Sequence, residues 1–135
     1  MIVGITGTRS GMTPHQMECV ENFFEETCIE EFHHGDCVGV DYEAALIAER
    51  LGIKTVCHPP VKTDLRAWHK STVMLEEKTY FSRNRFLVDC VDLLMVVPWE
   101  SERKETGGTW YTHDYGVKTK TGIKMFWPDA GPLFV

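Results

Sequence analysis

The sequence predicts a single α/β domain in which a mainly parallel, doubly wound sheet of five strands is covered by helices on both faces. Five short apolar runs alternate with helical patterns along the chain, and this alternation is typical of a parallel three-layer sandwich. The 135 residues, 43% of them hydrophobic, are enough for one domain with a substantial core. Because no internal repeat or linker interrupts the pattern, we expect one domain over residues 1–135.

The first strand and the first helix are indicated close to the N-terminus. The apolar run MIVGIT (1–6) predicts a buried strand. Thr13 as N-cap, Pro14 at the first helical position and Gln16 closing a capping box then predict the start of a helix. The apolar face of this helix is expected to hold Met17, Val20 and Phe24.

The next strand, helix and strand follow in the same way. CIEEFHHG (28–35) predicts a second, more polar strand, and IKTVCH (53–58) a third that ends at two prolines. Between them, residues 39–51 predict a helix with Asp41 as its cap and Gly52 as its C-terminal glycine. The expected buried stripe of this helix is Ala44, Ile47, Ala48 and Leu51.

The second half of the chain supplies two more helices and two more strands. Segment 61–79 is the least regular, and we interpret it as a loop with a short helix around 70–77. An amphipathic helix follows at 80–92, and LLMVVP (93–98) is the clearest buried strand in the chain. The inward residues of the helix are predicted to be Phe86, Leu87, Cys90 and Val91.

The last helix is predicted to begin at GGTW (107–110). Lys118 and Lys120 are expected in its last turn and Gly122 as its stop. IKMFW (123–127) then predicts the fifth strand. The aromatic C-terminal stretch MFWPDAGPLFV has two interpretations, since it could pack on a partner or cover the edge of its own sheet.

Charge and composition narrow the class of protein. The net charge is −6 and the pI about 5.5, which disfavours nucleic acid as the main partner but is compatible with one phosphorylated small molecule. No apolar run approaches the roughly 18 residues that span a bilayer, and the N-terminus has no basic signal-peptide region. The sequence therefore predicts a cytoplasmic protein with no membrane partner.

The cysteines and histidines do not match a known metal motif. The five cysteines share no CxxC spacing, and the closest combinations are His33 and His34 with Cys37, and Cys57 with His58. We therefore expect reduced, mostly buried thiols, no metal and no cofactor. One of the histidines at 33 and 34 is a candidate catalytic group, although two hydrogen-bonded structural histidines are favoured.

The loops that follow the strands carry the unusual residues, and in an open parallel sheet ligands bind at this edge. After the first strand, Gly7 and Gly11 allow a tight turn, while Thr8, Arg9 and Ser10 offer hydroxyls and a guanidinium suited to phosphate. The turn lacks the spacing of the known dinucleotide and P-loop motifs. It is interpreted as an anion-binding turn, with a plain strand-to-helix turn as the alternative.

The GGTW stretch predicts a second anion contact. Gly107, Gly108 and Thr109 place backbone amides at a helix N-terminus, where free N–H groups and the helix dipole favour an anion. Trp110 is a candidate wall on which a base stacks, with core packing as the alternative. Trp99 is the second candidate for stacking.

Two further segments are candidates for the same site. In RNR (83–85) the two arginines lie about 200° apart on a helix, so we expect only one of them to face the site, with Asn84 between them. A solvated helix face is the alternative. Asp36, in the loop after the second strand, is a candidate for binding ribose hydroxyls or for acid–base chemistry.

Several motifs together resemble one superfamily. GITGTR, HHGDCVGVDYEAA, YFSRNRFLVDCVDLLMVVP and GGTW are similar to the motif series of the SLOG superfamily, and most of all to small YpsA-like proteins of bacteria and phages. The superfamily also contains the Lonely Guy phosphoribohydrolases and the Rossmann-like domain of DNA-processing protein A. The resemblance covers roughly residues 1–130.

The resemblance implies a Rossmann-like fold that binds a nucleotide or a nucleotide-derived molecule, commonly as a homodimer. By this likeness the pocket would be lined by Gly7, Thr8, Arg9, Gly35, Asp36, Arg83, Asn84, Gly107, Gly108 and Thr109.

Some members of the superfamily hydrolyse the N-glycosidic bond of nucleoside monophosphates, and this is the alternative function; a DNA-processing accessory role is the third. The hydrolase signature P-G-G-x-G-T-x-x-E is altered here, because the stretch from Thr106 ends at Asp114 without the glutamate. The candidate catalytic carboxylates are therefore Asp36, Glu100 and Asp114.

Overall fold

The computed structural model describes residues 1–129, which form a parallel sheet of six strands and four helices. The strand order is β4-β3-β2-β1-β5-β6, and every neighbouring pair is parallel. In chain order the elements are β1 (Ile2–Gly7), α1 (Pro14–Glu26), β2 (Glu31–His34), α2 (Val40–Arg50), β3 (Lys54–Cys57), β4 (Val73–Met74), α3 (Tyr80–Asp89), β5 (Leu93–Val97), α4 (Gly108–Lys118) and β6 (Gly122–Met125).

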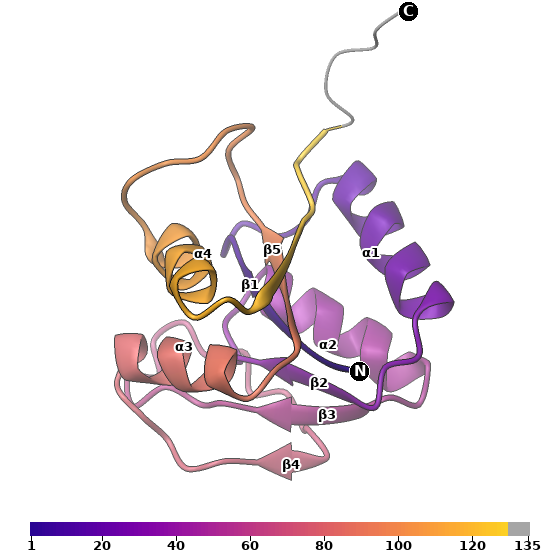
Figure 1. The fold of residues 1–135 in the computed structure, drawn as a ribbon. Helices are drawn as coiled ribbons and strands as arrows, with labels where there is room; N and C mark the ends of the chain where they lie inside the picture. The colour runs from indigo at the N-terminus through magenta and orange to yellow at the C-terminus, as the bar shows by residue number, and fades with distance from the viewer. Residues whose placement is uncertain (130–135) are drawn as a thin grey trace, which may run out of the picture.

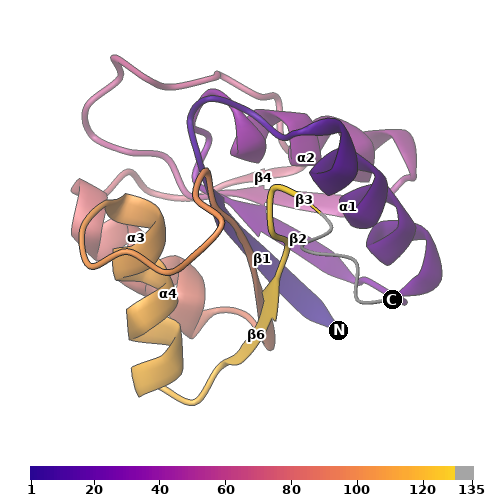
Figure 2. The same cartoon turned by 90° about the horizontal axis from the view of Figure 1, so that it is seen from above.

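The helices cover both faces of the sheet. Helices α1 and α2 pack on one face, and α3 and α4 lie side by side on the other (Figures 1 and 2). The chain moves outward from β1 to β4, then returns to place β5 on the other side of β1. The doubly wound, three-layer prediction is therefore confirmed, and the switch point in strand order lies between β1 and β5.

The hydrophobic core has two parts, one on each face of the sheet. The larger part joins β1, β2 and β5 to α1 and α2, and the smaller joins α3 to β5. Gly4 allows α3 to approach β1, because a Cβ at this position would lie 2.7 Å from a methyl carbon of Leu87. The largest fully buried apolar side chains include Trp110, Phe32, Ile5, Leu94 and Met95.

The start of α1 agrees with its local sequence. The Thr13 side chain accepts a hydrogen bond from the backbone of Gln16, and the Gln16 side chain accepts one from the backbone of Thr13. The Gln16 amide also donates to the carbonyl oxygens of Pro98 and Phe126, at 2.8 and 2.9 Å. The predicted capping box is confirmed, and the same side chain ties α1 to the chain just beyond β5 and β6.

The sheet has one strand more than predicted. Val73 and Met74 form β4, which pairs with the end of β3 at the sheet edge, so the helix expected around residues 70–77 is wrong. A two-residue edge strand is too short to give a periodic pattern. Its position is set by partners distant in sequence, including the bond from the Leu75 amide to the Cys57 carbonyl.

The inward face of α3 differs from the prediction. Arg83 and Asn84 are buried together with Leu87 and Val88, whereas Phe86 is exposed. Hydrophobicity alone placed Phe86 inside. The polar residues occupy the inward positions because their side chains find hydrogen-bond partners there.

The C-terminal ends of α2 and α4 also differ from the prediction. Helix α2 ends at Arg50, so Leu51 is exposed, although Gly52 has the expected positive φ of 74°. Helix α4 ends at Lys118, Lys120 lies beyond it with a φ of 62°, and Gly122 opens β6.

The C-terminal aromatic residues that the structure describes pack on the protein's own helices α1 and α4. Phe126 is buried against Phe23, with ring centres 5.8 Å apart, and Trp127 packs on Trp110 at 6.0 Å. Residues 130–135 of the predicted aromatic stretch lie outside the described part. Within residues 1–129 no helix combines the length and the apolar character needed to cross a bilayer.

Candidate functional site: a cleft at the carboxyl ends of β1 and β5

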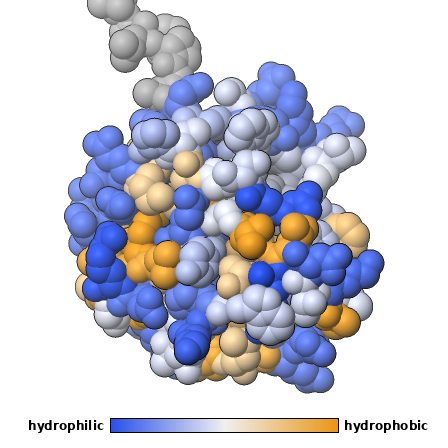
Figure 3. Space-filling view, turned by 180° about the vertical axis from the view of Figure 1, so that it is seen from behind, coloured by the Kyte–Doolittle hydropathy of each residue, from blue (hydrophilic) through white to orange (hydrophobic). Residues whose placement is uncertain are grey.

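Three adjoining cavities open at the edge of the sheet where the strand order reverses. Their volumes are about 30, 200 and 770 Å³, and Arg9 and Tyr80 line all three. From behind (Figure 3), the surface carries hydrophobic patches directly bordered by strongly hydrophilic groups. We call the three cavities, from the smallest to the largest, the inner pocket, the polar pocket and the groove.

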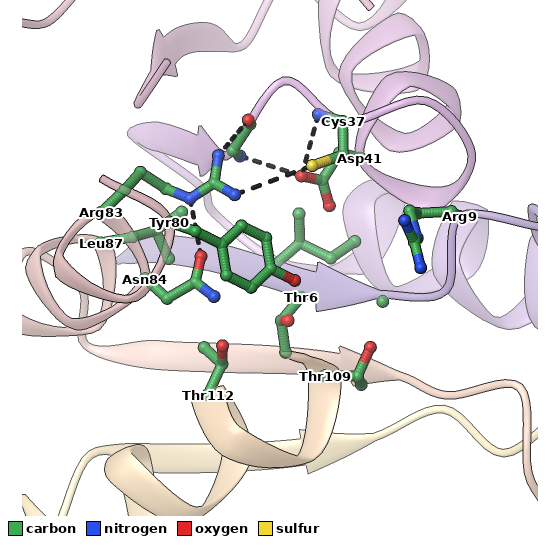
Figure 4. Close-up of a pocket in the computed structure, with 13 residues that line it drawn as sticks. Thr6, Arg9, Cys37, Asp41, Tyr80, Arg83, Asn84, Leu87, Thr109 and Thr112 are labelled. Carbon is green, nitrogen blue, oxygen red and sulfur yellow. Dashed lines mark hydrogen bonds between the residues drawn. The ribbon is translucent and has the colours of Figure 1, made fainter. Parts of the chain in front are cut away.

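The inner pocket has a polar lining built around Arg83. This guanidinium is 2% exposed; it donates to the carbonyl oxygens of Gly35 and His58 and to the Asn84 side chain. Figure 4 shows Tyr80 lying across the pocket, between these groups and the threonines of α4. Gly35 leaves room for the guanidinium, because a Cβ there would lie 2.6 Å from one of its nitrogens.

Asp41 is the acidic group of the inner pocket. Its carboxylate accepts hydrogen bonds from the backbone amides of Gly35 and Cys37, at 3.1 and 3.3 Å, so it secures the loop after β2 and caps no helix. Burial raises the pKa of Asp41 to about 6, although Arg83 and the two amides act in the opposite direction and Asp36 adds to the rise. Burial, and then Asp41, raise the pKa of the Cys37 thiol to about 11, so this thiol is protonated at neutral pH.

The raised pKa of Asp41 predicts a specific dependence of stability on pH. Because the folded protein holds this proton more tightly than the unfolded chain, the associated stability is complete below pH 3.8 and is lost as the pH rises through about 6. Relative to Asp41→Asn, the wild type should lose about 2 kcal/mol of unfolding free energy between pH 4 and 7. Urea unfolding of both proteins across this range measures the difference, and a difference that stays flat would contradict the assignment.

The polar pocket joins the two glycine-rich segments. It is lined by Gly7, Thr8, Arg9, Tyr80, Trp99, Glu100 and residues 106–110. Helix α4 begins here with Gly107 as its N-cap, no side-chain cap and no acidic residue in its first turn. A Cβ at Gly108 would overlap the Tyr80 hydroxyl, so this glycine allows the aromatic ring to lie against the helix start. The first amides of α4 therefore border a cavity that also contains a guanidinium.

The groove extends from the same point toward the loop that precedes β4. Val61, Leu65 and Phe81 give it apolar walls. Its charged lining residues are mainly cationic, with Arg9, Lys62 and Arg85 beside the single carboxylate of Asp64. No hydrogen bond or ion pair of the Arg9 side chain is found within residues 1–129. Together the polar pocket and the groove offer an anion site beside a larger, mixed apolar and cationic surface.

Most of the residues predicted for the site lie together around the cleft. The cavity linings include Gly7, Thr8, Arg9, Gly35, Arg83, Asn84, Gly107, Gly108 and Thr109. Of the two arginines in RNR, Arg83 is buried and lines the inner pocket, and Arg85 is exposed but also lines the groove, so the prediction that only one of them faces the site is wrong. Ser10 is exposed and lines none of the three cavities; its backbone amide bonds the Thr8 hydroxyl.

Asp36 does not reach the cleft. It is fully buried, and its carboxylate accepts hydrogen bonds from Nε of Arg66 at 2.8 Å and from the backbone amide of His69 at 2.9 Å. Both partners come from the loop before β4, which the sequence did not place. Asp36 therefore has a structural role, and neither ribose binding nor acid–base chemistry fits its position.

Asp114 lies elsewhere than predicted, whereas Trp110 lines the polar pocket but is packed in the core. Asp114 is on the outer side of α4, where it pairs with Arg103 at 2.6 Å and His113 at 2.8 Å. Trp110 is 2% exposed, donates from Nε1 to Glu100 and packs on Trp127, which favours the core-packing alternative. Trp99, by contrast, is 63% exposed at the polar pocket and is available for stacking.

Asp41 and Tyr80, which are central to the inner pocket, are among the site residues that sequence reasoning missed. The sequence predicted Asp41 to be a helix cap. Its role in the inner pocket depends on the close approach of α2 to the loop after β2. Tyr80 is the first residue of α3, and only its placement across from Gly108 reveals that it occupies the centre of the cleft. Its nearness to the RNR motif was the one available signal.

Comparison with known proteins adds evidence on the fold. No protein-family model matches the sequence, and no curated protein matches it. Among solved structures, the molybdenum cofactor binding protein of Rippkaea orientalis is similar with a TM-score of 0.70 and 17% identity, over 92% of this chain and 74% of that protein. DNA processing protein A of Streptococcus pneumoniae gives 0.70 and 17%, over 92% of this chain.

A third similar structure is the Moco carrier protein of Chlamydomonas reinhardtii, with a TM-score of 0.66 and 16% identity, over 93% of this chain and 75% of that one. At these identities the likeness shows a shared Rossmann-like fold. It includes DNA processing protein A, one of the groups that the sequence motifs resemble, although this chain spans only 49% of the Streptococcus protein.

Proposed function

Proceeding from this shared fold, we propose that the protein binds a nucleotide or nucleotide-derived small molecule in the cleft at the carboxyl ends of β1 and β5. The phosphate would lie between the Gly7–Gly11 turn and the Gly107–Thr109 helix start, with Arg9 as its cationic partner. The remainder of the ligand would extend into the groove beside Tyr80 and Phe81, and Trp99 would flank the phosphate on the other side.

One observation carries this proposal: the N-terminus of α4, which has no side-chain cap, and the guanidinium of Arg9, which has no partner within residues 1–129, border the same 200 Å³ pocket. Free amides at a helix N-terminus, aligned with the helix dipole, form an anion site, and a guanidinium binds phosphate through paired hydrogen bonds. The adjoining groove, at about 770 Å³, is in the size range of small-molecule sites.

The similar structures support a small-molecule ligand more than a nucleic acid. Two of them are named for the molybdenum cofactor. The Helicobacter pylori DNA processing protein A is described for its binding of single-stranded DNA, and this chain spans 64% of it. The net charge of −6 disfavours contact with a long phosphate backbone.

The test is a comparison of nucleoside 5′-monophosphates with the matching nucleosides. We expect AMP, GMP, CMP or UMP to raise the melting temperature, with a stabilisation of about 2.7 kcal/mol when the ligand is a hundredfold above its Kd. The nucleosides, which lack the phosphate, should give a much smaller shift. If the nucleosides stabilise as strongly as the monophosphates, or if neither stabilises, the phosphate assignment is wrong.

A second candidate function, N-glycosidic hydrolysis of a nucleoside monophosphate, is favoured by two carboxyl groups at the cleft. Glu100 lines the polar pocket, and Asp41 lines the inner pocket with a pKa of about 6, within the range of a general acid. Chromatography of the incubated monophosphates would reveal free base and ribose phosphate. Base release that stops in Glu100→Gln or Asp41→Asn supports this activity, and stabilisation without base release supports binding alone.

A further inference from the structure

A cluster of two histidines and a cysteine lies on the α3 face of the sheet, away from the cleft. His33 is on β2, His58 follows β3, and Cys90 caps the C-terminus of α3. One ring nitrogen of each histidine and the Cys90 sulfur all lie within 4.8 Å of one another. None of these three residues lines the three cavities of the cleft, so the cluster is a site separate from the proposed ligand pocket.

The two imidazoles are joined to each other and to a carboxylate. Nδ1 of His33 lies 2.7 Å from Nε2 of His58, and Nε2 of His33 lies 2.8 Å from Oε1 of Glu31. When Glu31 accepts the proton of Nε2, the lone pair of a neutral His33 is on Nδ1 and faces His58. A carboxylate that orients a histidine in this way is the usual outer partner of a metal-binding imidazole.

His58 contains a polar atom that its surroundings do not satisfy. The residue is 1% exposed, and within the described chain its Nδ1 has no hydrogen-bond partner. Buried polar atoms without partners are uncommon in folded proteins and carry a free-energy cost. The His58 ring packs against the ring of Phe86, with centres 5.4 Å apart.

We propose that His33, His58 and Cys90 form a binding site for a soft divalent cation of the Zn²⁺ type. Imidazole nitrogen and thiolate sulfur are the preferred ligands of zinc. In a tetrahedral site the ligand atoms lie about 3.3 to 3.7 Å apart, whereas Nδ1 of His33 and Nε2 of His58 lie 2.7 Å apart, so the two rings must turn or separate slightly to admit an ion. Cys90 is half-buried where the chain leaves α3, and its thiol proton would be released to water when the sulfur binds the ion.

A second cluster on the opposite face shows why the first is preferred. His34, Asp36 and Cys57 are also close enough to share an ion. The Asp36 oxygens, however, already accept from Arg66 and the His69 amide, and Nε2 of His34 lies 2.8 Å from the Ser71 hydroxyl. The carboxylate and the imidazole of this second cluster are therefore satisfied without a metal, whereas the first cluster leaves Nδ1 of His58 without a partner within residues 1–129.

Cobalt(II) binding at pH 7 tests the site. Titration of the chelator-treated, metal-free protein with Co²⁺ should produce the thiolate-to-cobalt absorption band, which zinc then removes. Cys90→Ser should lose the band, and Cys28→Ser should keep it, because Cys28 is exposed and is not a member of the cluster. Glu31→Gln should weaken binding about tenfold by releasing the His33 ring. Absence of the band in the wild type, or its persistence in Cys90→Ser, overturns the proposal.

A measurement on the wild type covers the case in which Cys90→Ser does not fold. Alkylation by iodoacetamide, followed by mass spectrometry of each cysteine, should be slowed by Zn²⁺ at Cys90 and unchanged at Cys28. Equal alkylation of Cys90 with and without zinc would show that this thiol binds no metal, and protection of Cys57 alone would assign the ion to the other face of the sheet.

Discussion

Arg83→Met is expected to destabilise the fold by about 3 to 5 kcal/mol, the usual result of removing one member of a buried charged network. The guanidinium donates to the Gly35 and His58 carbonyls and to the Asn84 side chain. Methionine fills a similar volume but donates nothing, so these acceptors would remain buried and unsatisfied. Asp41 would also lose the nearby positive charge that lowers its pKa.

Urea unfolding followed by circular dichroism measures this effect, with Arg85→Met as the matched control. Arg85 is two residues away on the same helix and exposed, where it donates to the Tyr111 hydroxyl. Its replacement should change the unfolding free energy by no more than about 0.5 kcal/mol. Equal losses in the two variants would mean that the inner pocket does not depend on Arg83.

Arg9→Ala should weaken binding of a nucleoside monophosphate by about 10- to 100-fold, as expected for the loss of a charged hydrogen bond worth about 1.5 to 3 kcal/mol. The side chain is exposed and borders all three cavities, so its removal should leave the stability of the free protein nearly unchanged. Calorimetric titration of wild type and variant gives the two dissociation constants.

Arg50→Ala is the control for general charge effects, because Arg50 is an exposed arginine at the far end of α2 and pairs with Glu21. It removes the same charge from the protein without touching the cleft. A similar loss of affinity in both variants would indicate attraction by the overall charge. Unchanged affinity in Arg9→Ala would remove Arg9 from the site.

The fold was largely predictable because its signals are local. The capping box at Thr13 and Gln16 and the apolar run of β5 need only neighbouring residues to specify a helix start and a buried strand. Alternation of such elements then implies the parallel sheet. The short strand β4 was missed because its two residues form a strand only by pairing with the end of β3.

The parts of the site that depend on local backbone shape were predictable from the sequence. The parts that depend on side chains distant in the sequence were not. The positions of Arg9 and Gly108 at the cleft could be predicted, because Arg9 lies in the turn after the first strand and Gly108 lies at a helix start. The role of Asp36 could not be read from the sequence, because it depends on Arg66 and on a loop with no regular pattern. The role of Asp114 was equally unpredictable, because its partner Arg103 lies in the irregular loop before α4.

The central claim, that a phosphate lies at the start of α4 opposite Arg9, is tested most directly by amide chemical-shift mapping with ¹⁵N-labelled protein. Titration with AMP should shift the resonances of Gly107, Gly108, Thr109 and Arg9 most, and inorganic phosphate should reproduce this subset without the shifts in the groove. Unmoved amides at these four positions, or shifts confined to the separate cavity beside Phe23 and Lys124, would contradict it.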